Sequence, residues 1–284
     1  MMELPFQIDL TGQVAVVTGG SGVIGGVFCR ALAVCGAKVA VLGRTVENAE
    51  PVVWEITANG GEAMAVAADV LDKSSLLRAR EIILDRWGKI NILVNCAGGA
   101  VKGATIPQDQ YADLEEMEDG TQSFFNVDAE MVHKEFDLNI YGTILPTQIF
   151  AECMVGQENA NVINISSMGA YHPMTRIPGY AGAKAAVSNF TEWAATYFAK
   201  SGVRVNAIAP GFFQTPQNRS LQFNPDGTPS ARSAKILSST PMGRYGVPEE
   251  LVGALLFLVS PQGSAFVTGI TLPVDGGFHC YLGV

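Results

Sequence analysis

Short apolar runs alternate with longer segments of helical periodicity along most of this 284-residue chain. The runs are rich in Val, Ile, Leu and Ala, as in strands buried on both faces, and lie at 14–17, 38–42, 63–67, 90–94, 162–165, 203–209 and 270–274. Apolar residues at helical spacing fill most of the intervals, for example 46–58, 187–198 and 249–259. The alternation predicts a doubly wound α/β fold, with a seven-stranded parallel sheet flanked by helices on both faces.

An α/β chain of this length can remain one unit, so residues 1–284 are expected to form a single domain. The segment at about 212–246 differs from the rest in composition. Between 216 and 246 it carries four prolines, three glycines and several basic residues. Such segments commonly close over a bound small molecule, and we expect a substrate lid here.

A glycine-rich turn follows the first apolar run. Residues 18–25 read TGGSGVIG, and a helical pattern begins directly after them. Glycines let the backbone approach a pyrophosphate, and the N-terminus of the next helix favours its charge, so a Rossmann-type dinucleotide site is predicted. The alternative is a tight turn with no ligand. The expected contacts are Gly19, Ser21, Gly22, Val23, Ile24 and Gly25.

The second strand ends in Gly43-Arg44, where an acidic residue would bind the ribose hydroxyls of NAD. A guanidinium can instead bind a 2′-phosphate through several donors, so NADP is favoured over NAD. The alternative is an exposed loop arginine.

Chemistry-bearing side chains follow the fifth strand. Ser166 and Ser167 lie at its end, and Tyr180 and Lys184, four residues apart, share one face of the next helix. A nearby ammonium should lower the tyrosine pKa, so that Tyr180 exchanges a proton near neutral pH. The alternative is a surface helix with one aromatic side chain and one lysine.

A serine followed by Tyr-x-x-x-Lys at this spacing resembles the short-chain dehydrogenase/reductase family, over nearly the whole chain. The resemblance implies hydride transfer between NAD(P) and a carbonyl or hydroxyl group. Tyr180 would exchange the proton, Ser167 would hydrogen-bond the substrate oxygen, and Lys184 would bind the nicotinamide ribose. Asn139, in an Asn-x-x-Gly match at 139–142, would bend its helix and hold a water in a proton relay to the lysine.

The glycine spacing departs from this pattern. The single-domain branch of the family usually has Thr-Gly-x-x-x-Gly-x-Gly, but Val23 occupies the place of the middle glycine. Gly20, Gly22 and Gly25 fit Gly-x-Gly-x-x-Gly, whereas Gly19, Gly22 and Gly25 fit the Gly-x-x-Gly-x-x-Gly of longer epimerases and dehydratases. A sugar-nucleotide epimerase or dehydratase therefore stays open as an alternative, although the chain ends without the length for a second domain. A non-catalytic cofactor-binding protein is a further alternative.

The resemblance also implies contacts along the rest of the cofactor. Asp69 would accept a hydrogen bond from the adenine amine, unless it only caps the next helix, and Val70 would lie against the ring. In the stretch 95–98, Asn95 would tie neighbouring strands together. The remaining cofactor residues are Ala97, Gly98, Pro210, Gly211, Phe213 and Thr215, the last four from a Pro-Gly-x-x-x-Thr match.

Basic and polar residues near the expected pocket suggest a hydroxylated anion as substrate, with Arg176, Arg219 and His172 as candidate contacts. Exposed loop side chains are the alternative. Long phrases at 163–171, 176–191 and 206–219 resemble a sugar-acid subgroup of D-mannonate oxidoreductases (fructuronate reductases), whose relatives include gluconate 5-dehydrogenases. Another keto-sugar or 3-oxoacyl reductase remains possible.

The acidic loop within 99–127 is longer than the family has, and a solvated loop is favoured there over a metal site.

Composition limits the partners. The net charge of -9 argues against nucleic acid and anionic membrane surfaces, and no apolar run approaches 18 residues. The N-terminus does not resemble a signal peptide, and five scattered cysteines give no metal or disulfide spacing, which suits the cytoplasm. We expect a small-molecule substrate, no metal and, from the family alone, a homotetramer.

Overall fold

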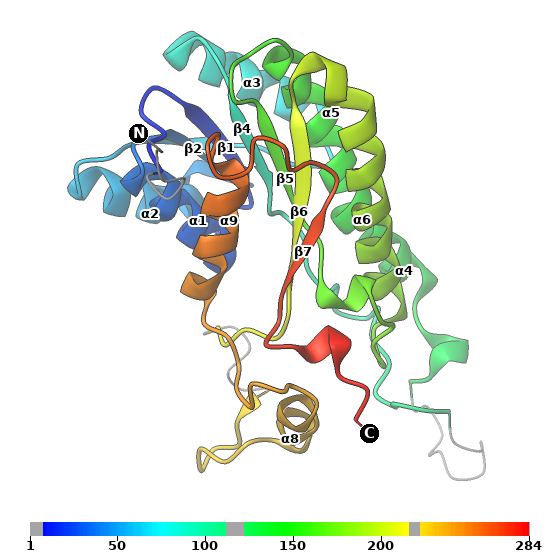
Figure 1. Ribbon diagram of the computed structural model, residues 1–284. Coiled ribbons are helices and arrows are strands. Elements are labelled where there is room, and N and C mark those ends of the chain that lie inside the picture. Colours follow the sequence, from blue (N-terminus) through cyan, green and yellow to red (C-terminus); the bar gives the residue numbers. More distant parts are fainter. Residues whose placement is uncertain (1–7, 112–121, 216–221, 284) are drawn as a thin grey trace.

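The computed structural model describes residues 8–111, 122–215 and 222–283. Its centre is a parallel sheet of seven strands in the order β3-β2-β1-β4-β5-β6-β7 (Figure 1). The order reverses between β1 and β4, so the carboxyl ends of these two strands open onto a crevice. The strands are β1 (Val14–Thr18), β2 (Lys38–Gly43), β3 (Glu62–Ala67), β4 (Ile92–Asn95), β5 (Asn161–Ile165), β6 (Arg204–Pro210) and β7 (Thr271–Val274).

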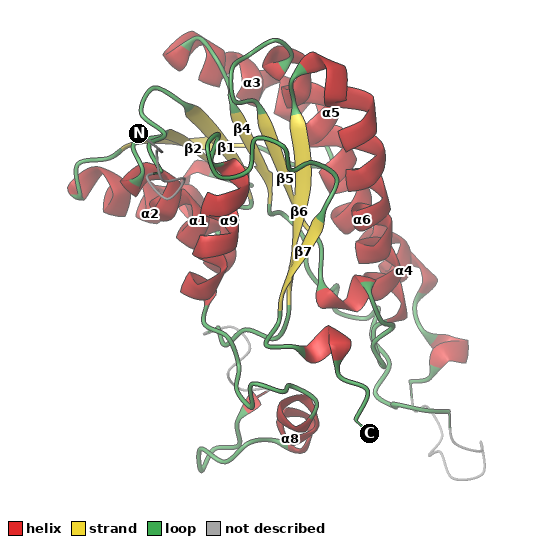
Figure 2. Ribbon diagram, in the orientation of Figure 1, coloured by secondary structure: helices red, strands yellow, loops and turns green. Residues whose placement is uncertain are grey.

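Helices cover both faces of this sheet, as Figures 1 and 2 show. One face carries α1 (Val23–Val34), α2 (Val46–Ala58) and α9 (Val252–Val259). The other carries α3 (Lys73–Trp87), α5 (Gly142–Met154) and α6 (Pro178–Phe198), with α4 (Ala129–Phe136) against the start of α6. Short helical turns complete the chain: η2 (Phe124–Asn126), η3 (Asp137–Tyr141), η4 (Met168–Ala170), η5 (Ala199–Ser201), η6 (Pro248–Leu251) and η7 (Phe278–Cys280).

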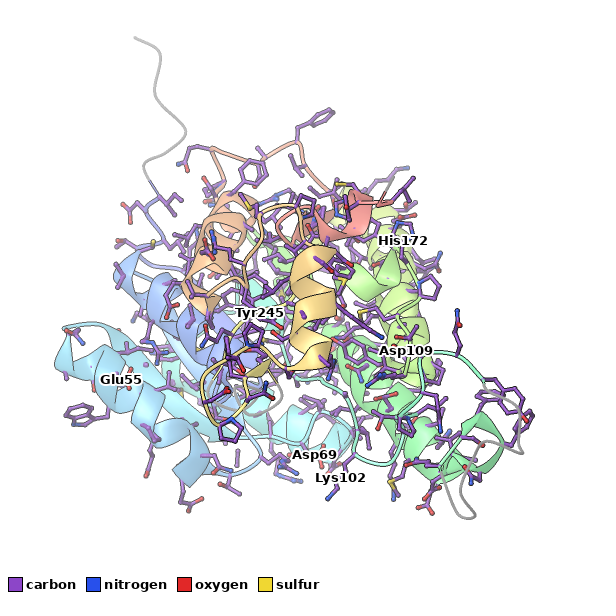
Figure 3. The ribbon with its side chains drawn as sticks, turned by 90° about the horizontal axis from the view of Figure 1, so that it is seen from below. Glu55, Asp69, Lys102, Asp109, His172 and Tyr245 are labelled. Atoms are coloured by element: carbon purple, nitrogen blue, oxygen red, sulfur yellow. The ribbon has the colours of Figure 1, made fainter. Side chains whose placement is uncertain are left out.

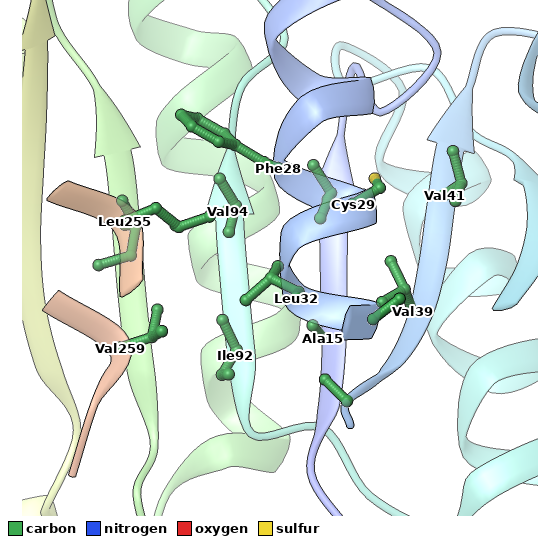
Figure 4. Packing of buried hydrophobic residues seen from close by; sticks show 14 of the residues in the cluster. Ala15, Phe28, Cys29, Leu32, Val39, Val41, Ile92, Val94, Leu255 and Val259 are labelled. Atoms are coloured by element: carbon green, nitrogen blue, oxygen red, sulfur yellow. The ribbon is translucent and has the colours of Figure 1, made fainter. Parts of the chain in front are cut away.

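The sheet is buried because each face packs against an apolar helix surface. On the α1 side, Phe28 and Leu32 fill the space between the strands and Leu255 of α9 (Figure 4). On the other side, Leu76 of α3 and Phe150 of α5 pack into a second cluster. All five side chains named here are 0% exposed, and each contributes roughly 1.5–3 kcal/mol by leaving water. Strands enclosed in this way need apolar residues on both faces, which explains the uninterrupted runs in the sequence.

The lid segment predicted at about 212–246 contains α8 (Ala231–Ser238), which lies beyond the carboxyl edge of the sheet (Figure 1). A 2.7 Å hydrogen bond between the hydroxyls of Ser233 and Tyr245, both buried, ties α8 to the end of the segment. An isolated bridge between Phe213 and Gly246 closes the segment at its base. Its motion as a lid, like the single-domain assignment, stays a prediction.

The predicted fold is confirmed, and each strand begins and ends within two residues of the expected position. The helix expected to bend at Asn139 is interrupted there, because a π-helical turn, Asp137–Tyr141, separates α4 from α5. In the described part of the chain, every helix is too short or too polar to cross a bilayer.

Candidate active site

A cavity of about 320 Å³ opens at the carboxyl ends of β1, β4, β5 and β6. It brings together residues that are up to about two hundred positions apart in the chain, because parallel strands end at one edge of the sheet. Its walls contain three of the four predicted catalytic residues and most of the predicted cofactor contacts. They are Gly19, Gly22, Val23, Ile24, Gly25, Cys96, Gly98, Gly99, Ile165, Ser166, Ser167, Tyr180, Lys184, Pro210, Gly211, Phe213 and Thr215.

The glycine turn follows the spacing of Gly19, Gly22 and Gly25, which all line the cavity. Gly19 has φ +62°, and a Cβ there would lie 2.9 Å from the backbone of Ala97. Gly22 precedes α1 and offers no side-chain cap, so the first backbone N–H groups of that helix are left to another acceptor. Gly20 faces Val41 and Cys29 instead, away from the cavity wall. Because no side chains cover the backbone of this turn, a pyrophosphate in the cavity could approach its N–H groups closely.

Ser167, Tyr180 and Lys184 converge on the same cavity from β5 and α6. The Lys184 ammonium donates a 2.7 Å hydrogen bond to the carbonyl of Ile165 and lies 5.7 Å from the centre of the Tyr180 ring. The Ser167 hydroxyl is close enough to hydrogen-bond the Tyr180 hydroxyl, which lowers the tyrosine pKa. The structure therefore assembles a phenol, a hydroxyl and an amine around one space.

The expected pKa of Tyr180 is wrong in direction for the protein alone. Burial of the hydroxyl is the largest effect and raises its pKa above the ordinary value, and the charge of Glu135 adds to this. The sequence argument considered only the neighbouring ammonium. Burial acts on that group too and lowers the pKa of Lys184 to about 8. At neutral pH, Tyr180 is thus a protonated acid beside a charged lysine.

Asn139 lies in the π-helical turn, which matches the expected bend in its helix. Its amide donates to the carbonyls of Gly99 (2.9 Å) and Glu135 (2.8 Å), and its Oδ1 accepts from the Gly99 N–H at 3.0 Å. The side chain is therefore occupied in holding the loop at the cavity wall. The main-chain carbonyl of Asn139 also has a partner, because it accepts from the Thr143 hydroxyl at 2.8 Å. A water held by Asn139 remains a prediction.

Several predicted cofactor residues lie behind or beyond the cavity. Asn95 is buried and donates to Thr147 (2.8 Å) and Asn164 (2.9 Å), which confirms that it ties neighbouring strands but removes it from the wall. Ala97 lies behind Gly19, and Val70 is buried against Gly142.

The nucleotide end of the predicted site lies on the surface. Asp69 is exposed and binds the N–H of Leu71 at 2.9 Å, and the helix-cap alternative for Asp69 is wrong because Asp72 caps α3. Arg44 is exposed at the end of β2. Ser21 lies beside the preceding residue, since a Cβ on Gly43 would come 3.1 Å from the Ser21 hydroxyl.

Two of the three predicted substrate residues, Arg176 and His172, line a second cavity of about 380 Å³ beside α8. Arg176 has φ +72°, unusual for a residue other than glycine, and its Nε donates to Asp109 at 2.6 Å. Lys235 of α8 donates to the other oxygen of Asp109 at 2.6 Å. His172 lines the same cavity, and Figure 3 shows Asp109 and His172 on one side of α8. Arg219 lies outside the described residues, as does the acidic cluster at 113–119.

Sequence reasoning missed two carboxylates that the fold brings to the site. Asp109 joins α8 to the loop of Arg176, and Lys235 first and then Arg176 hold its pKa well below the usual range. Glu135 is fully buried beside Tyr180. Cys96 also lines the first cavity, and burial raises the pKa of its thiol to about 12. Glu135 is one of several charged residues on the amphipathic helix α4, and nothing in the sequence marks it as the buried one.

Comparison with known proteins places this geometry in context. The profile of the short chain dehydrogenase family matches residues 13–225. An uncharacterised oxidoreductase of Bacillus subtilis, UxuB, is 50% identical over 281 residues, which cover 99% of this chain and 100% of the relative.

Two solved structures that are similar to this chain contain a bound dinucleotide. One from Haemophilus influenzae, provisionally named a D-mannonate oxidoreductase and holding NAD, has a TM-score of 0.95 at 44% identity, with 99% and 100% of the two chains covered. A gluconate 5-dehydrogenase of Burkholderia cenocepacia, in complex with NADP and tartrate, has a TM-score of 0.80 at 30% identity, covering 98% and 99%.

Proposed function

The chain belongs to the short-chain dehydrogenase family, and on that premise we propose that it interconverts a carbonyl and a hydroxyl on a sugar acid of the D-fructuronate/D-mannonate type. The observation that carries the reaction class is the meeting of Ser167, Tyr180 and Lys184 in a cavity whose opposite wall is a glycine turn. The residues fit a dinucleotide there. A Cβ on Gly98 would fall 2.9 Å from Asn139 Oδ1 and 3.2 Å from the Lys184 ammonium, so glycine leaves space beside both groups.

Ser167, Tyr180 and Lys184 have different roles in the proton transfer that accompanies the reaction. A bound nicotinamide dinucleotide supplies the hydride in reduction and accepts it in oxidation. As the carbonyl carbon gains hydride, negative charge grows on its oxygen, where Ser167 donates a hydrogen bond and Tyr180 donates its proton. The raised pKa of Tyr180 keeps that proton in place until the oxygen becomes basic. Lys184 remains close to the resulting phenolate and stabilises it.

The second cavity supports an anionic substrate. Arg176, Arg232 and Lys235 face it with Asp109 as their counter-charge, which leaves an excess of positive charge in a protein of net charge -9. Because Asp109 takes only the Nε of Arg176 in the hydrogen bonds described, the two terminal nitrogens are available to fork a carboxylate. Phe212 lines this cavity and Phe213 the first, so the two spaces are neighbours. A hydroxylated carboxylate could span them, with its carbonyl at Tyr180.

Cofactor preference is a finer proposal. We expected NADP from Arg44, but the relative at 44% identity holds NAD, which does not favour that preference. No acidic side chain ends β2, where Gly43 lies beside Ser21 and Arg44 is exposed. We propose that both dinucleotides are used, with Arg44 contributing affinity for the 2′-phosphate of NADP.

One assay tests the function. Purified protein is supplied with NADH or NADPH and with fructuronate, 5-ketogluconate, a 3-oxoacyl thioester and neutral ketones, and absorbance of the reduced cofactor is followed. We expect the keto sugar acids to turn over fastest. Turnover of the thioester alone would favour the 3-oxoacyl reductase alternative. Tight cofactor binding without any turnover would favour a non-catalytic cofactor-binding protein.

A homotetramer is the expectation carried by the family. On α6, the exposed rings of Trp193 and Tyr197 stack with their centres 5.1 Å apart, a surface that such an assembly would cover. Light scattering at assay concentration tests this, and a monomer would contradict it.

A further inference from the structure

Glu135 on α4 is a buried carboxylate to which the mechanism above assigns no step. It is 0% exposed, and its Oε1 accepts from the backbone N–H of Val101 at 2.9 Å. Its Oε2 points to the start of α6, where a Cβ on Gly179 would lie 2.5 Å away from it. Among the described residues Oε2 makes no hydrogen bond of ordinary geometry, but the carboxylate lies near enough to the N–H of Tyr180 for that N–H to lower the Glu135 pKa. A buried carboxylate needs such partners, because an isolated one is strongly disfavoured.

The start of α6 lacks an acceptor of its own. The residue before the helix is Ile177, which has no polar side chain, and Pro178 has no N–H. The first turn of α6 also contains no acidic residue to complement the partial positive charge of the helix N-terminus. Glu135 supplies from α4 the negative charge that the catalytic helix does not carry itself.

The same residue reaches the cofactor side of the cavity. Val101, its Oε1 partner, follows the loop at Gly98 and Gly99 that lines the cavity wall. The backbone carbonyl of Glu135 accepts from the Asn139 amide, which also binds Gly99. Glu135 thus joins the helix that carries the proton donor to the loop beside the cofactor space.

We propose that Glu135 is a positioning residue, which fixes the first turn of α6 and so holds the Tyr180 hydroxyl beside Ser167. The inference rests on the proposed acid–base role of Tyr180. It also explains the glycine at 179, because any side chain there would displace the carboxylate.

The groups that face Tyr180 predict a second effect. They are Glu135 from α4, Cys96 after β4, Ser167 after β5 and Lys184 from α6. Burial raises the Tyr180 pKa most, the Ser167 hydrogen bond lowers it, and Glu135 and then Cys96 raise it. Removing the charge of Glu135 should therefore lower the Tyr180 pKa, whereas a purely structural loss should leave it in place.

The test compares Glu135→Gln with Glu135→Asp in alcohol oxidation, where the phenolate acts as base. The control is Thr191→Val, at a position further along α6. This change removes the buried hydrogen bond that the Asn164 amide donates to the Thr191 hydroxyl. We expect E135Q to lower kcat roughly tenfold, to change KM less than about twofold, and to move the acidic limb of the kcat profile to lower pH. E135D keeps the charge, so it should keep the limb and lose only part of kcat. T191V should lose stability and keep the limb.

If the acidic limb of the kcat profile of E135Q falls at the same pH as in the wild type, the proposal is overturned. If E135Q does not fold, the E135D variant provides the test. Values of kcat and KM equal to those of the wild type would refute a positioning role, because the shorter side chain cannot reach the same partners. Wild-type protein that turns over no carbonyl substrate would be a different failure, that of the proposed function itself.

Discussion

Lys184→Met should make the protein more stable while it abolishes turnover. The Lys184 side chain is 3% exposed, and burial lowers its pKa from the ordinary 10.5 to about 8. A difference of that size corresponds to about 3 kcal/mol of destabilisation when the lysine is charged in both the folded and the unfolded states. Methionine fills a similar volume without the charge. It loses the 2.7 Å hydrogen bond to Ile165, which contributes about 1 kcal/mol.

The net expectation is a gain of about 2 kcal/mol in the free energy of unfolding at pH 7. With an unfolding entropy of ~2 cal/mol/K per residue, Tm should rise by about 3 °C. The gain must depend on pH. Below about pH 8 the penalty is complete, because both states hold the proton. As the pH rises from about 8 towards 10.5, the folded lysine loses its proton and the penalty disappears, so near pH 9.5 the two proteins should differ by less than about 1 kcal/mol.

Equilibrium urea unfolding of cofactor-free protein at several pH values measures this difference. Lys200→Met is the matched control, since Lys200 is exposed just beyond α6 and its charge stays in water. It should change stability by less than about 0.5 kcal/mol at every pH. A Lys184→Met protein that is less stable than wild type at pH 7, or a difference that does not shrink with rising pH, would refute the reasoning.

Four further changes test the site and its scaffold. Tyr180→Phe should lower kcat by about 10² to 10⁴, with cofactor affinity by fluorescence titration unchanged, and near-full turnover would defeat the acid–base role. Arg44→Ala should lower kcat/KM with NADPH about tenfold or more and leave the NADH value within about twofold; equal losses would count against a 2′-phosphate contact. Arg176→Gln should raise KM for a keto sugar acid more than for a neutral ketone, and equal effects would remove the anion contact. Asn95→Ala should cost about 2 kcal/mol in urea unfolding, since Thr147 and Asn164 lose their partner, and an unchanged midpoint would contradict that tie.

The order of apolar runs and helical segments predicted the fold closely, because strands enclosed on both faces must be apolar throughout. The same pattern placed the candidate residues at strand ends around one cavity, although their roles stay predictions. Gly19 after β1, Gly98 after β4, Ser167 after β5 and Gly211 after β6 had to meet, since parallel strands finish at a common edge. The helix interruption at Asn139 was expected only as a bend.

The chain's own order of residues thus determined which elements form and which side chains gather at the carboxyl edge. Packing decided the rest, because it depends on contacts between elements distant in sequence. Burial reverses the expected shift of the Tyr180 pKa, and only the meeting of α4 with α6 brings Glu135 to that tyrosine. Asp109 likewise forms ion pairs with Arg176 and with Lys235 of α8, which lie far along the chain. No local sequence pattern predicts these two contacts.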